Sequence, residues 1–505
     1  MEELREHLPL DVRGLHIHFV GIKGTGMAAL VEILLARGAV ITGSDVSERF
    51  YTDEILEKNG IKALPFSAEN ITPAVKFVVY SSAYNLEKNP DLKEASARGI
   101  PMILYSQALG DLSAPVYSAG VCGVHGKTTT TGMVGTLLKN VDLPSQVLAG
   151  SIISSFGGSC TMTSSSCAEN GPSYFVAETC EYQRHFMAFH PKKIILTSVE
   201  SDHQDYYPAY EDIRDAFVDY ICLLPENGQL IYCSDDAGAS EAAEIALSKR
   251  PDINLVPYGV TAEGDYGISF KGVKGGRQSF SLASGLEFEL SVPGEHNVRN
   301  AAAAIALVFE MIKTDGKNPL DYADKIREAL LSFAGGKRRS EIVGRAKNPY
   351  GQEVIVIDDY GHHPTAIATT LKGYREFYKN HCIIVDFMSH TYTRTAALLE
   401  EFASCFDSAD SVIINKIYGS AREDASAAGV TGEILAEHAM RHHQSVVYAG
   451  EFTEARDRAL EMLRKKSGSH YSEGYLFVTM GAGDNWKVGK MVLEELQKES
   501  GEKAK

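Results

Sequence analysis

Short runs of apolar residues alternate with segments of helical periodicity along most of the chain. The first run, LHIHFV at residues 15–20, precedes a helical pattern that ends near Arg37, and a second run, AVITGSD, ends at Asp45. From Glu353 onward, further apolar runs alternate with helical segments: EVIVID, CIIVDF, SVIIN, SVVYA and YLFVTM. Because parallel strands that are buried on both faces form continuous apolar runs, the pattern predicts an α/β protein with largely parallel sheets.

The stretch PVYSAGVCGVHGKTTTTGMVGTLLKN predicts a buried strand, a glycine-rich turn and the start of a helix. Gly123 and Gly126 permit a tight turn whose N–H groups point inward, Lys127 adds a positive charge, and the Thr128 hydroxyl is placed to ligate Mg²⁺. The usual phosphate loop has another glycine where this chain has Val121, so GVHGKTTT is a shorter variant. We predict a nucleotide phosphate site here; the alternative is an ordinary turn with a surface lysine.

A second glycine-rich turn follows the first apolar run. Gly24, Gly26 and Ala29 match G-x-G-x-x-A, and Asp45 lies 21 residues after Gly24, where a dinucleotide fold has its ribose-binding acid. A nucleoside diphosphate presents the same pyrophosphate and ribose, so the pattern indicates a nucleotide without selecting a nicotinamide. The alternative is a turn that serves only close helix packing.

Polar residues follow several predicted strands. Ser81 and Ser82 end the strand KFVVYSS, where they are placed to contact a ligand or to cap a helix. Glu178 ends SYFVAE, and His203 follows KKIILTSVE. An acid at the tip of a strand beside a phosphate loop commonly holds Mg²⁺, so we predict Glu178 as a metal ligand and His203 as a second one.

Two later segments carry candidate nucleotide contacts. His296, Asn297 and Asn300 lie near the start of the predicted alanine-rich helix in VPGEHNVRNAAAAIALV, where they would either cap the helix or recognise a base edge. The segment FAGGKRRSEIVGR contains a basic cluster of Lys337, Arg338 and Arg339. By its residues alone, this cluster is typical of a solvated charge run.

Four polar motifs follow strands of the expected C-terminal sheet. The carboxyl ends of parallel strands meet at one edge of a sheet, so we expect these motifs to converge there. They are DDYGHHP (358–364), MSHTYTR (388–394), IYGSARE (417–423) and MGAGDN (480–485). The polar stretch at 157–173 is expected to be a surface loop without chemistry.

Composition narrows the possible functions. A chain of 505 residues suggests about three domains of ~150 residues each, and 44% hydrophobic with 23% charged residues is typical of a globular protein. The formal net charge of -17 argues against a nucleic-acid or anionic-membrane partner, since both require a basic face. An anionic substrate must therefore be met by local cations.

Cysteine usage and the apolar segments bear on location. The eight cysteines form no CxxC pair and no regular framework, which favours a reducing compartment. Glu2, Glu3 and Glu6 near the first residue argue against a signal peptide, and the longest apolar run, residues 301–309, is far too short to span a membrane. We expect a cytoplasmic protein with no membrane partner.

Taken together, the motifs closely resemble the Mur ligases over nearly the whole chain. They are HFVGIKGTGM, GVHGKTTT, the AE before residue 179, SDH, EHNVRNAAAA, FAGGKRR, DDYGHHPT, H-x-Y-T-R-T and TMGAGD, in this order. The resemblance implies three α/β domains: an N-terminal Rossmann-like domain for a UDP-sugar (1–112), a central P-loop ATPase (113–335) and a C-terminal Rossmann-like domain for an amino acid (336–505). The motifs are most similar to those of the family member that joins L-alanine to UDP-N-acetylmuramate.

The resemblance also implies the ligands of the first two domains. ATP would be bound by Gly123, Val124, His125, Gly126, Lys127, Thr128, Thr129, His296, Asn297, Asn300, and Arg338 or Arg339. Mg²⁺ would be held by Thr128, Glu178 and His203. The UDP-sugar would contact Gly24, Gly26, Met27, Asp45, Ser81 and Ser82.

In the C-terminal domain, the resemblance implies the place where the amino acid meets the sugar carboxylate. The residues there are Tyr360, His362, His363, His390 and Arg394, with Arg394 the expected partner of the amino acid's carboxylate. Catalysis would depend on Lys127, His363, His390 and Arg394. Residues 178–186 lack the acid-rich sequence usual at that point in the family, which leaves Glu181 and His185 as the candidate substrate contacts there.

Four other positions depart from the family's pattern. Val124 replaces a threonine, Ser198 replaces an asparagine, and Ser389 stands where proline precedes the histidine. Lys23 stands where the first loop usually has another glycine, and it would either contact a diphosphate or point to solvent. None of these changes removes a charge that the reaction needs.

The implied activity is amide formation with ATP and Mg²⁺, in which a carboxylate is converted to an acyl phosphate and then attacked by an amine. One alternative is the recycling relative that attaches a whole peptide to the same sugar, although its first loop reads differently. A dinucleotide-dependent oxidoreductase, suggested by Gly24 to Asp45, leaves the GKT loop unexplained. The last alternative is a nucleotide-binding regulator without catalysis.

Overall fold

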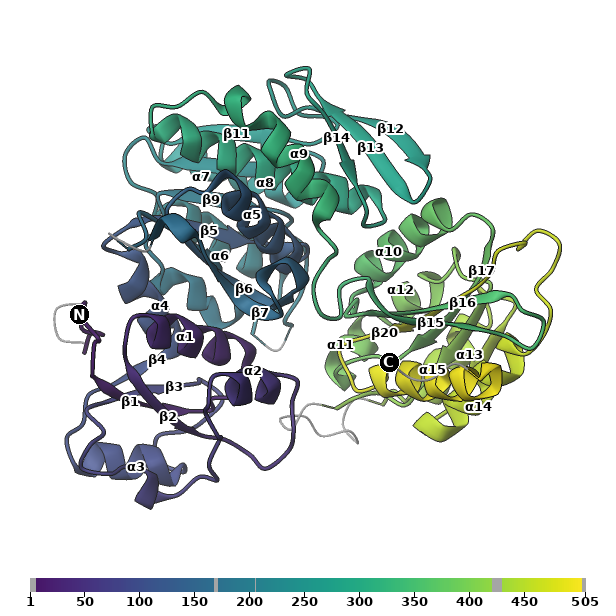
Figure 1. Cartoon of the computed structure of the whole chain (residues 1–505), viewed down its shortest axis with the longest axis horizontal. Coiled ribbons are helices and arrows are strands. Elements are labelled where there is room, and N and C mark those ends of the chain that lie inside the picture. The colour runs from purple at the N-terminus through teal and green to yellow at the C-terminus, as the bar shows by residue number, and fades with distance from the viewer. Residues whose placement is uncertain (1–5, 168–170, 205, 420–428, 502–505) are drawn as a thin grey trace. The chain divides into compact units, whose positions relative to one another are not determined.

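The computed structural model describes residues 6–167, 171–204, 206–419 and 429–501 (Figure 1). Part of the motif IYGSARE, from residue 420 on, lies outside these residues. The chain divides into two compact units, each described here by itself. Unit 1 comprises Met1–Glu200, Glu211–Gly267 and Asn300–Ala329, and unit 2 comprises Ser201–Tyr210, Ile268–Arg299 and Leu330–Lys505.

Unit 1 begins with a parallel four-stranded sheet in the order β2-β1-β3-β4, purple in Figure 1. Its elements are β1 (His16–Val20), α1 (Thr25–Ala36), β2 (Val40–Ser44), α2 (Thr52–Lys58), β3 (Phe77–Tyr80), α3 (Pro90–Ala97), β4 (Met102–Leu104) and α4 (Tyr105–Ser113). The predicted strand–turn–helix–strand opening is confirmed. The glycine-rich turn therefore lies at the carboxyl end of β1, between its neighbours β2 and β3.

The second sheet of unit 1 has seven strands in the order β11-β10-β9-β5-β8-β6-β7. The strands are β5 (Tyr117–Cys122), β6 (Ser145–Ile153), β7 (Ser159–Thr163), β8 (Tyr174–Glu178), β9 (Lys193–Leu196), β10 (Gln229–Cys233) and β11 (Asn254–Tyr258). Its helices are α5 (Lys127–Val141), α6 (Tyr210–Ile221), α7 (Ala237–Lys249) and the first-unit part of α8 (Glu295–Thr314). All its strand pairs are parallel except β6–β7, and β5 lies between β8 and β9.

One expectation for this sheet is wrong. Residues 159–163, within the stretch expected to be a surface loop, form the edge strand β7. Cys160 and Met162 are buried while Ser159 and Thr161 are half-buried, so the strand alternates as an edge strand should. The Ser159 hydroxyl donates to Glu32 of α1 at 2.7 Å. Serine and threonine dominate the strand, and this polar composition concealed the alternation.

Unit 2 contains a three-stranded antiparallel sheet and a six-stranded sheet in the order β15-β16-β20-β17-β18-β19. The strands are β12 (Ile268–Lys274), β13 (Arg277–Leu282), β14 (Glu287–Leu290), β15 (Glu341–Lys347), β16 (Glu353–Asp359), β17 (His381–Phe387), β18 (Ser411–Ile414), β19 (Val446–Tyr448) and β20 (Gly474–Met480). The helices are α9 (Ala323–Ser332), which begins in unit 1, α10 (Pro364–Phe377), α11 (Tyr392–Ala397), α12 (Leu399–Ser404), α13 (Gly432–Ala439), α14 (Phe452–Leu463) and α15 (Trp486–Ser500). Only β15 runs antiparallel to its neighbour in the larger sheet.

The six-stranded sheet is covered on both faces. Ile355 and Ile357 of β16 belong to a core that includes residues of α10, α12 and α13, whereas Val354 and Val356 belong to a core with α14 and α15. Successive strand residues point to opposite faces, so a run such as EVIVID must be apolar at nearly every position. This burial explains why the sequence predicted these strands correctly.

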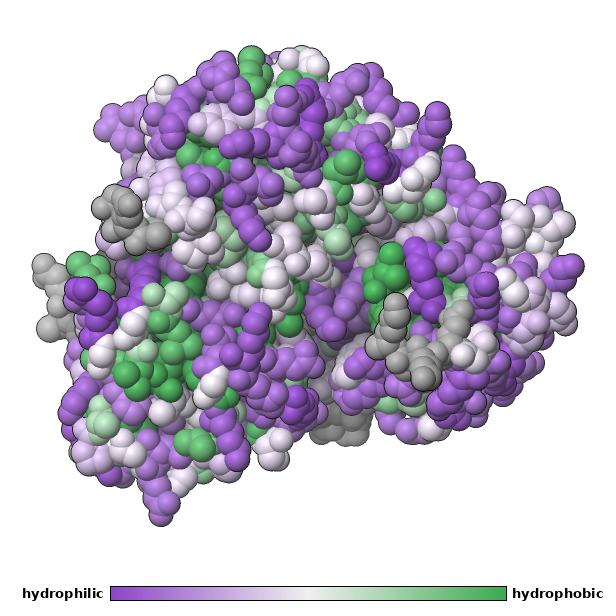
Figure 2. All heavy atoms as spheres, viewed as in Figure 1, coloured by the Kyte–Doolittle hydropathy of each residue, from purple (hydrophilic) through white to green (hydrophobic). Residues whose placement is uncertain are grey.

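No described helix is long and apolar enough to cross a membrane. On the face shown in Figure 2, hydrophilic residues cover most of the surface and hydrophobic residues form smaller areas. This distribution is typical of a protein surface exposed to water.

A buried carboxyl group lies at the end of β17. Asp386 accepts hydrogen bonds from the side-chain amides of Asn415 at 3.0 Å and Asn485 at 3.3 Å. The carbonyl oxygens of the same two amides have no hydrogen-bond partner within the described residues. Burial raises the pKa of Asp386 from 3.8 to about 7. The native state therefore binds a proton at Asp386 between these pH values, and its stability falls as the pH rises through this window.

We expect Asp386→Asn to stabilise the protein at pH 8, because an amide carries no charge to desolvate and can donate to one of the unpartnered oxygens. The midpoint of thermal unfolding, followed by circular dichroism, should rise by about 2 °C or more at pH 8 and by less at pH 5. The exposed Asp407→Asn is the control and should show no such pH dependence. An equal change for Asp386→Asn at both pH values would contradict this account.

Candidate functional site

The turn between β5 and α5 requires glycine at two positions. Gly123 has φ of 130° and Gly126 has φ of 80°, both in the range that favours glycine. A Cβ at Gly123 would lie 2.1 Å from Thr197 Oγ1, and one at Gly126 would lie 2.7 Å from Asn300 Oδ1. Helix α5 begins at Lys127 without a side-chain cap, so its first N–H groups are oriented toward an anion at the turn.

Residues at the tip of β9 hold this turn in place. The Val124 N–H donates to the Ser198 carbonyl at 3.0 Å, and the His125 N–H donates to Ser198 Oγ at 2.9 Å. The Thr197 hydroxyl donates to the carbonyls of Cys122 and His125. The sequence singled out Ser198 only as a departure from the family's pattern, and its contact with the phosphate turn was not predicted. Its position directly after a predicted strand was the feature that could have indicated this contact.

Lys127 is half-buried at the base of the turn, with its side chain 15% exposed. Its ammonium donates to Glu181 Oε1 at 2.9 Å and to the Val124 carbonyl at 3.3 Å. Burial alone would lower the pKa of Lys127, but the neighbouring carboxylates of Glu181 and Glu178 raise it overall. The ammonium therefore keeps its positive charge beside the turn at neutral pH.

Two of the three predicted metal ligands lie together. The Thr128 hydroxyl donates to Glu178 Oε1 at 3.0 Å, and Glu178 Oε2 accepts the Gly150 N–H at 2.7 Å. A Cβ at Gly150 would lie 2.5 Å from that carboxylate, so the glycine allows Glu178 its position. A hydroxyl and a carboxylate oxygen beside a phosphate turn fit a hard cation such as Mg²⁺. His203 belongs to unit 2, so its part in the metal site stays a prediction.

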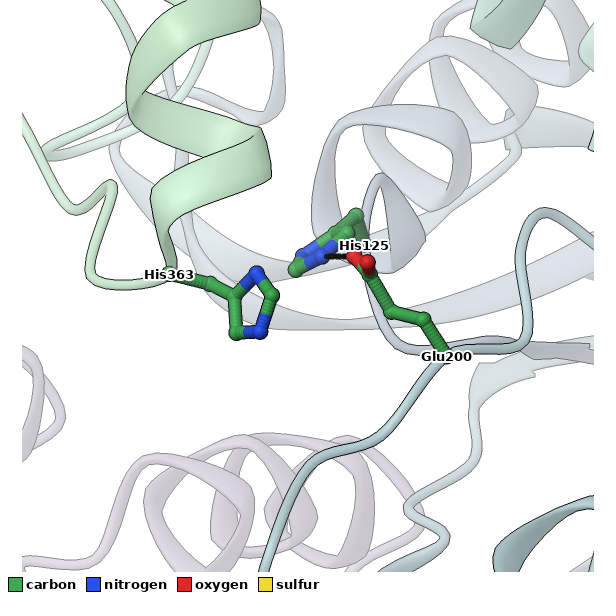
Figure 3. A group of neighbouring side chains, drawn as sticks. All are labelled: His125, Glu200 and His363. Atoms are coloured by element: carbon green, nitrogen blue, oxygen red, sulfur yellow. Dashed lines mark hydrogen bonds and ion pairs between the residues drawn. The ribbon is translucent and has the colours of Figure 1, made fainter. Parts of the chain in front are cut away.

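His125 of the phosphate turn faces Glu200 beyond the end of β9. Figure 3 shows the imidazole directed toward the carboxylate, with a contact between His125 Nε2 and Glu200 Oε1. Both side chains are half-buried. The pair places a titratable group directly beside the turn, and no pattern in the sequence pointed to Glu200.

Arg394 forms a buried ion pair within unit 2. Its Nε and Nη2 donate to Asp202 Oδ1 at 3.1 and 2.7 Å, and the two side chains are 7% and 4% exposed. Burial would raise the pKa of Asp202, but the Arg394 guanidinium and nearby imidazoles hold it well below its ordinary value. Arg394 Nη1 is buried without a hydrogen-bond partner among the described residues. This donor is suited to an additional carboxylate.

The histidines after β16 lie beside this ion pair or at the start of α10. Burial, together with the Arg394 guanidinium, lowers the pKa of His362 well below its ordinary value. His362 is therefore neutral at pH 7, and its ring is a weak base. His363 is buried at the N-cap position of α10. Both belong to unit 2 with Arg394, as the convergence of these motifs on one sheet edge predicted.

The two predicted arginines differ in their contacts. Arg338 donates to Asp358 at 2.9 Å and to the Gly481 carbonyl at 2.7 Å. The guanidinium carbons of Arg338 and Arg339 lie 5.3 and 4.9 Å from the centre of the Tyr360 ring. Arg338 is thus fixed to the sheet edge. Of the two, Arg339 has the less constrained guanidinium for a phosphate.

His390 follows β17 and stacks on the ring of Tyr418, with ring centres 5.7 Å apart. The next residue, Thr391, has φ of 69°, which is strained for a β-branched side chain. Its N–H donates to the Tyr418 carbonyl at 2.9 Å, a contact that helps hold this conformation. Strained residues of this kind concentrate at functional sites.

The motif at the start of α8 separates into two parts. Asn300 lies in unit 1 against Gly126, and its role in nucleotide binding stays a prediction. In unit 2, Asn297 donates to the Pro293 carbonyl at 2.7 Å, so its amide helps form the turn before the helix. Burial lowers the pKa of His296 to about 4, which keeps its ring neutral.

Glu181 and His185 lie in or beside the 3₁₀ segment η5 (Tyr182–Ala188). Glu181 accepts a hydrogen bond from the Lys127 ammonium. Burial lowers the pKa of His185. The His185 ring packs against Tyr182 with 6.3 Å between ring centres. Their direct contact with a substrate stays a prediction.

The predicted UDP-sugar residues surround the first glycine-rich turn. A Cβ at Gly26 would lie 2.6 Å from the Tyr105 ring, so this glycine permits close packing of α1 and α4. Met27 is buried, and Gly24 is exposed at the start of α1. Asp45 is also buried and accepts a hydrogen bond from Tyr84 at 2.8 Å.

Two hydroxyls follow β3 at the same edge of the sheet. The Ser81 N–H donates to the Val20 carbonyl at 3.0 Å, while its hydroxyl accepts the Ala83 N–H at 3.3 Å. Ser82 is exposed. The structure thus places Ser81 beside the first turn, and ligand contact by either serine stays a prediction.

Two glycine-rich turns lie at the carboxyl ends of parallel strands, and polar residues gather at the edge of another sheet, an arrangement typical of a nucleotide-dependent enzyme. Residues 16–117 match the Mur ligase family, catalytic domain; residues 121–308 match the Mur ligase middle domain; and residues 338–483 match the Mur ligase glutamate ligase domain. The chain belongs to the Mur ligase family and has its three-domain α/β architecture.

Individual relatives give a finer comparison. The chain is 48% identical over 498 residues to UDP-N-acetylmuramate–L-alanine ligase of Treponema pallidum (strain Nichols), covering 98% of this chain and 99% of the relative. It is 36% identical over 475 residues to the ligase of the same name from Borreliella afzelii (strain PKo), covering 93% and 97%.

Solved structures give the same picture. The UDP-N-acetylmuramate-alanine ligase of Thermotoga maritima superposes with a TM-score of 0.74 at 26% identity, covering 96% of this chain and 100% of that one. A murein peptide ligase from Psychrobacter arcticus 273-4 gives a TM-score of 0.65 at 23% identity, covering 96% and 99%. The second likeness shows the fold alone.

We expect Ser198→Ala to weaken nucleotide binding, because the His125 N–H loses its acceptor and the phosphate turn loosens. The dissociation constant of a fluorescent ATP analogue, measured by titration, should rise about tenfold. The exposed Ser248→Ala on α7 is the matched control and should bind as the unmodified chain does. Unchanged affinity in Ser198→Ala would show that the Ser198 hydroxyl is not needed to hold the turn.

Proposed function

We propose that this protein joins L-alanine to UDP-N-acetylmuramate with ATP in the synthesis of peptidoglycan precursors. The 48% identity to the Treponema pallidum ligase over nearly the full length of both chains supports this activity. The observation that carries it in the structure is the phosphate turn with Lys127, Thr128 and Glu178 beside it. As a proposal, the enzyme works in the cytoplasm, where ATP and UDP-sugars are available.

The reaction must overcome the poor electrophilicity of a carboxylate. With ATP and Mg²⁺ bound, transfer of the γ-phosphate to the sugar's carboxylate gives an acyl phosphate, which the amine of alanine attacks to release phosphate. The residues of this chain bring two anions together. The Lys127 ammonium and the first N–H groups of α5 would stabilise the phosphate groups, and Thr128 with Glu178 would hold the metal.

The acidic neighbour of Lys127 has a role in this scheme. The Glu181 carboxylate compensates the charge of the Lys127 ammonium and helps to raise its pKa, so Lys127 remains charged. A phosphate would offer stronger charge-assisted bonds to the same group. The N–H groups of α5 require no such exchange, because the backbone already orients them.

Amino-acid binding is proposed to use Arg394 and the histidines around it. The unpartnered Nη1 of Arg394 is the donor we assign to the carboxylate of alanine. His363 and His390 are the candidates for accepting the proton that the ammonium group must lose before attack, whereas the lowered pKa of His362 makes that ring a weak base. ADP, phosphate and the amide are then the products.

The first experiment measures amide formation with a panel of amino acids. ATP hydrolysis should require both UDP-N-acetylmuramate and L-alanine and should produce ADP and phosphate; AMP and pyrophosphate would exclude the proposal. The rates with glycine and serine, compared with the rate with L-alanine, measure how strictly the enzyme selects the alanine side chain.

The same assay tests the alternative activities. Faster reaction with L-alanyl-γ-D-glutamyl-meso-diaminopimelate than with alanine would identify the peptide-recycling activity instead. NAD(P)H titration should give no binding signal.

We expect Lys127→Met to reduce ligation at least about 100-fold, because the transferred phosphate loses its nearest cation. Binding of UDP-N-acetylmuramate, measured by calorimetry, should remain largely intact, since that site lies at the first sheet. The matched control is Lys139→Met, near the end of the same helix, where the ammonium donates to the Ser155 carbonyl at 2.9 Å. Loss of both ligation and UDP-sugar binding would count against the assignment of the two sites.

A further inference from the structure

Lys23, in the first glycine-rich turn, does not point to solvent. Its ammonium donates to the Glu48 carbonyl at 2.7 Å and forms an ion pair with Asp53 Oδ1 at 3.2 Å. The side chains of Lys23 and Asp53 are 8% and 14% exposed, so the pair is largely shielded from water. The Phe50 ring lies 5.9 Å from the ammonium. The charge of Lys23 is therefore paired within residues 45–53, which link β2 to the first turn of α2.

The backbone of Lys23 contacts both ends of that segment. Its N–H donates to Asp45 Oδ2 at 2.7 Å, and its carbonyl accepts the Thr52 hydroxyl at 2.5 Å. Asp45 in turn accepts the Val46 N–H at 2.8 Å through its other oxygen. One residue of the glycine-rich turn thus binds the 45–53 segment at its beginning, middle and end.

These contacts change the expected role of Asp45. Both of its oxygens already accept hydrogen bonds, from Lys23 and Val46 and from the Tyr84 hydroxyl. A carboxylate can accept about four, so Asp45 retains capacity for a ribose hydroxyl only in the orientation that these donors fix. The position of the segment, and with it of Asp45, depends on the contacts that Lys23 makes.

We infer that Lys23 is a positioning residue for the nucleoside diphosphate of the substrate: it fastens the 45–53 segment to the glycine-rich turn and does not itself bind the diphosphate. This inference rests on the proposed function, because it assumes that the first sheet holds a UDP-sugar. The N–H groups at the start of α1 and the turn itself then supply the contacts to the phosphates.

Substitutions in the Lys23–Asp53 ion pair distinguish a positioning role for Lys23 from direct binding of the diphosphate. If Lys23 positions the segment, removing either partner of the pair loosens the same structure, and both variants bind the UDP-sugar less well. If Lys23 binds the diphosphate, Asp53 competes with the ligand for the ammonium. Neutralising Asp53 would then release Lys23 and tighten binding. The two readings predict opposite signs for Asp53→Asn.

The experiment compares Lys23→Met, Asp53→Asn and the double variant in the full-length protein. The amide introduced by Asp53→Asn keeps an oxygen for the Phe50 N–H, which Asp53 accepts at 2.7 Å, so this substitution isolates the ion pair. Calorimetry with UDP-N-acetylmuramate should show a dissociation constant raised about tenfold in each single variant and no further in the double variant. The kcat at saturating UDP-N-acetylmuramate and the KM for ATP should change less than about twofold.

Arg49→Met is the matched control. It removes a cation of the same segment whose ion pair with Glu57 is exposed, with side-chain exposures of 65% and 56%, and it should leave UDP-sugar affinity unchanged. Amide hydrogen exchange across residues 46–53 should accelerate in Lys23→Met and Asp53→Asn but not in Arg49→Met. This readout follows the segment directly and does not depend on any ligand.

Tighter binding in Asp53→Asn, additive losses in the double variant, or unchanged exchange in both single variants would overturn the positioning role. If Lys23→Met fails to fold, the sign of the change in Asp53→Asn still decides between the two readings. If the unmodified chain itself does not bind UDP-N-acetylmuramate, the proposed function fails instead, and the exchange experiment still tests the contact between Lys23 and the segment.

Discussion

The phosphate turn after β5 is the constraint on which the rest of the site depends. Gly123 and Gly126 adopt backbone angles that other residues avoid, and neighbouring atoms leave no room for a Cβ at either position. The turn is then fastened from the tip of β9 by Thr197 and Ser198. Because the turn is fixed in this way, the start of α5 and the side chain of Lys127 are oriented before any phosphate arrives.

The second property is how the cations of the candidate sites are stabilised in a chain whose formal net charge is -17. Four cations of the candidate sites pair with a buried or largely buried carboxylate: Lys127 with Glu181, Arg394 with Asp202, Arg338 with Asp358 and Lys23 with Asp53. A buried cation without such a partner would be costly. Substrate anions therefore compete with an existing partner at Lys127, whereas Arg394 retains an uncommitted donor.

Some residues near the candidate sites have strained backbone conformations. His203, Arg338 and Thr391 all have positive φ without being glycine, and each either is or directly adjoins a residue predicted to belong to the site. Hydrogen bonds from neighbouring segments hold two of them: the Arg338 carbonyl accepts the Tyr360 N–H at 2.7 Å, and Thr391 bonds Tyr418. The surrounding fold thus maintains backbone conformations that these segments would not adopt alone.

Local patterns in the sequence determined the alternation of strands and helices, the two glycine-rich turns and the membership of the family, because each depends on residues close together in the chain. The tertiary structure decided the rest. The polar strand β7 needed β6 as its partner, and Ser198 reaches His125 across 73 positions of sequence. In the sequence, the charge of Lys23 suggested a contact with a diphosphate. The structure shows that this ammonium forms an ion pair with Asp53. Contacts between distant segments leave no periodic signal, so the sequence alone could not reveal them.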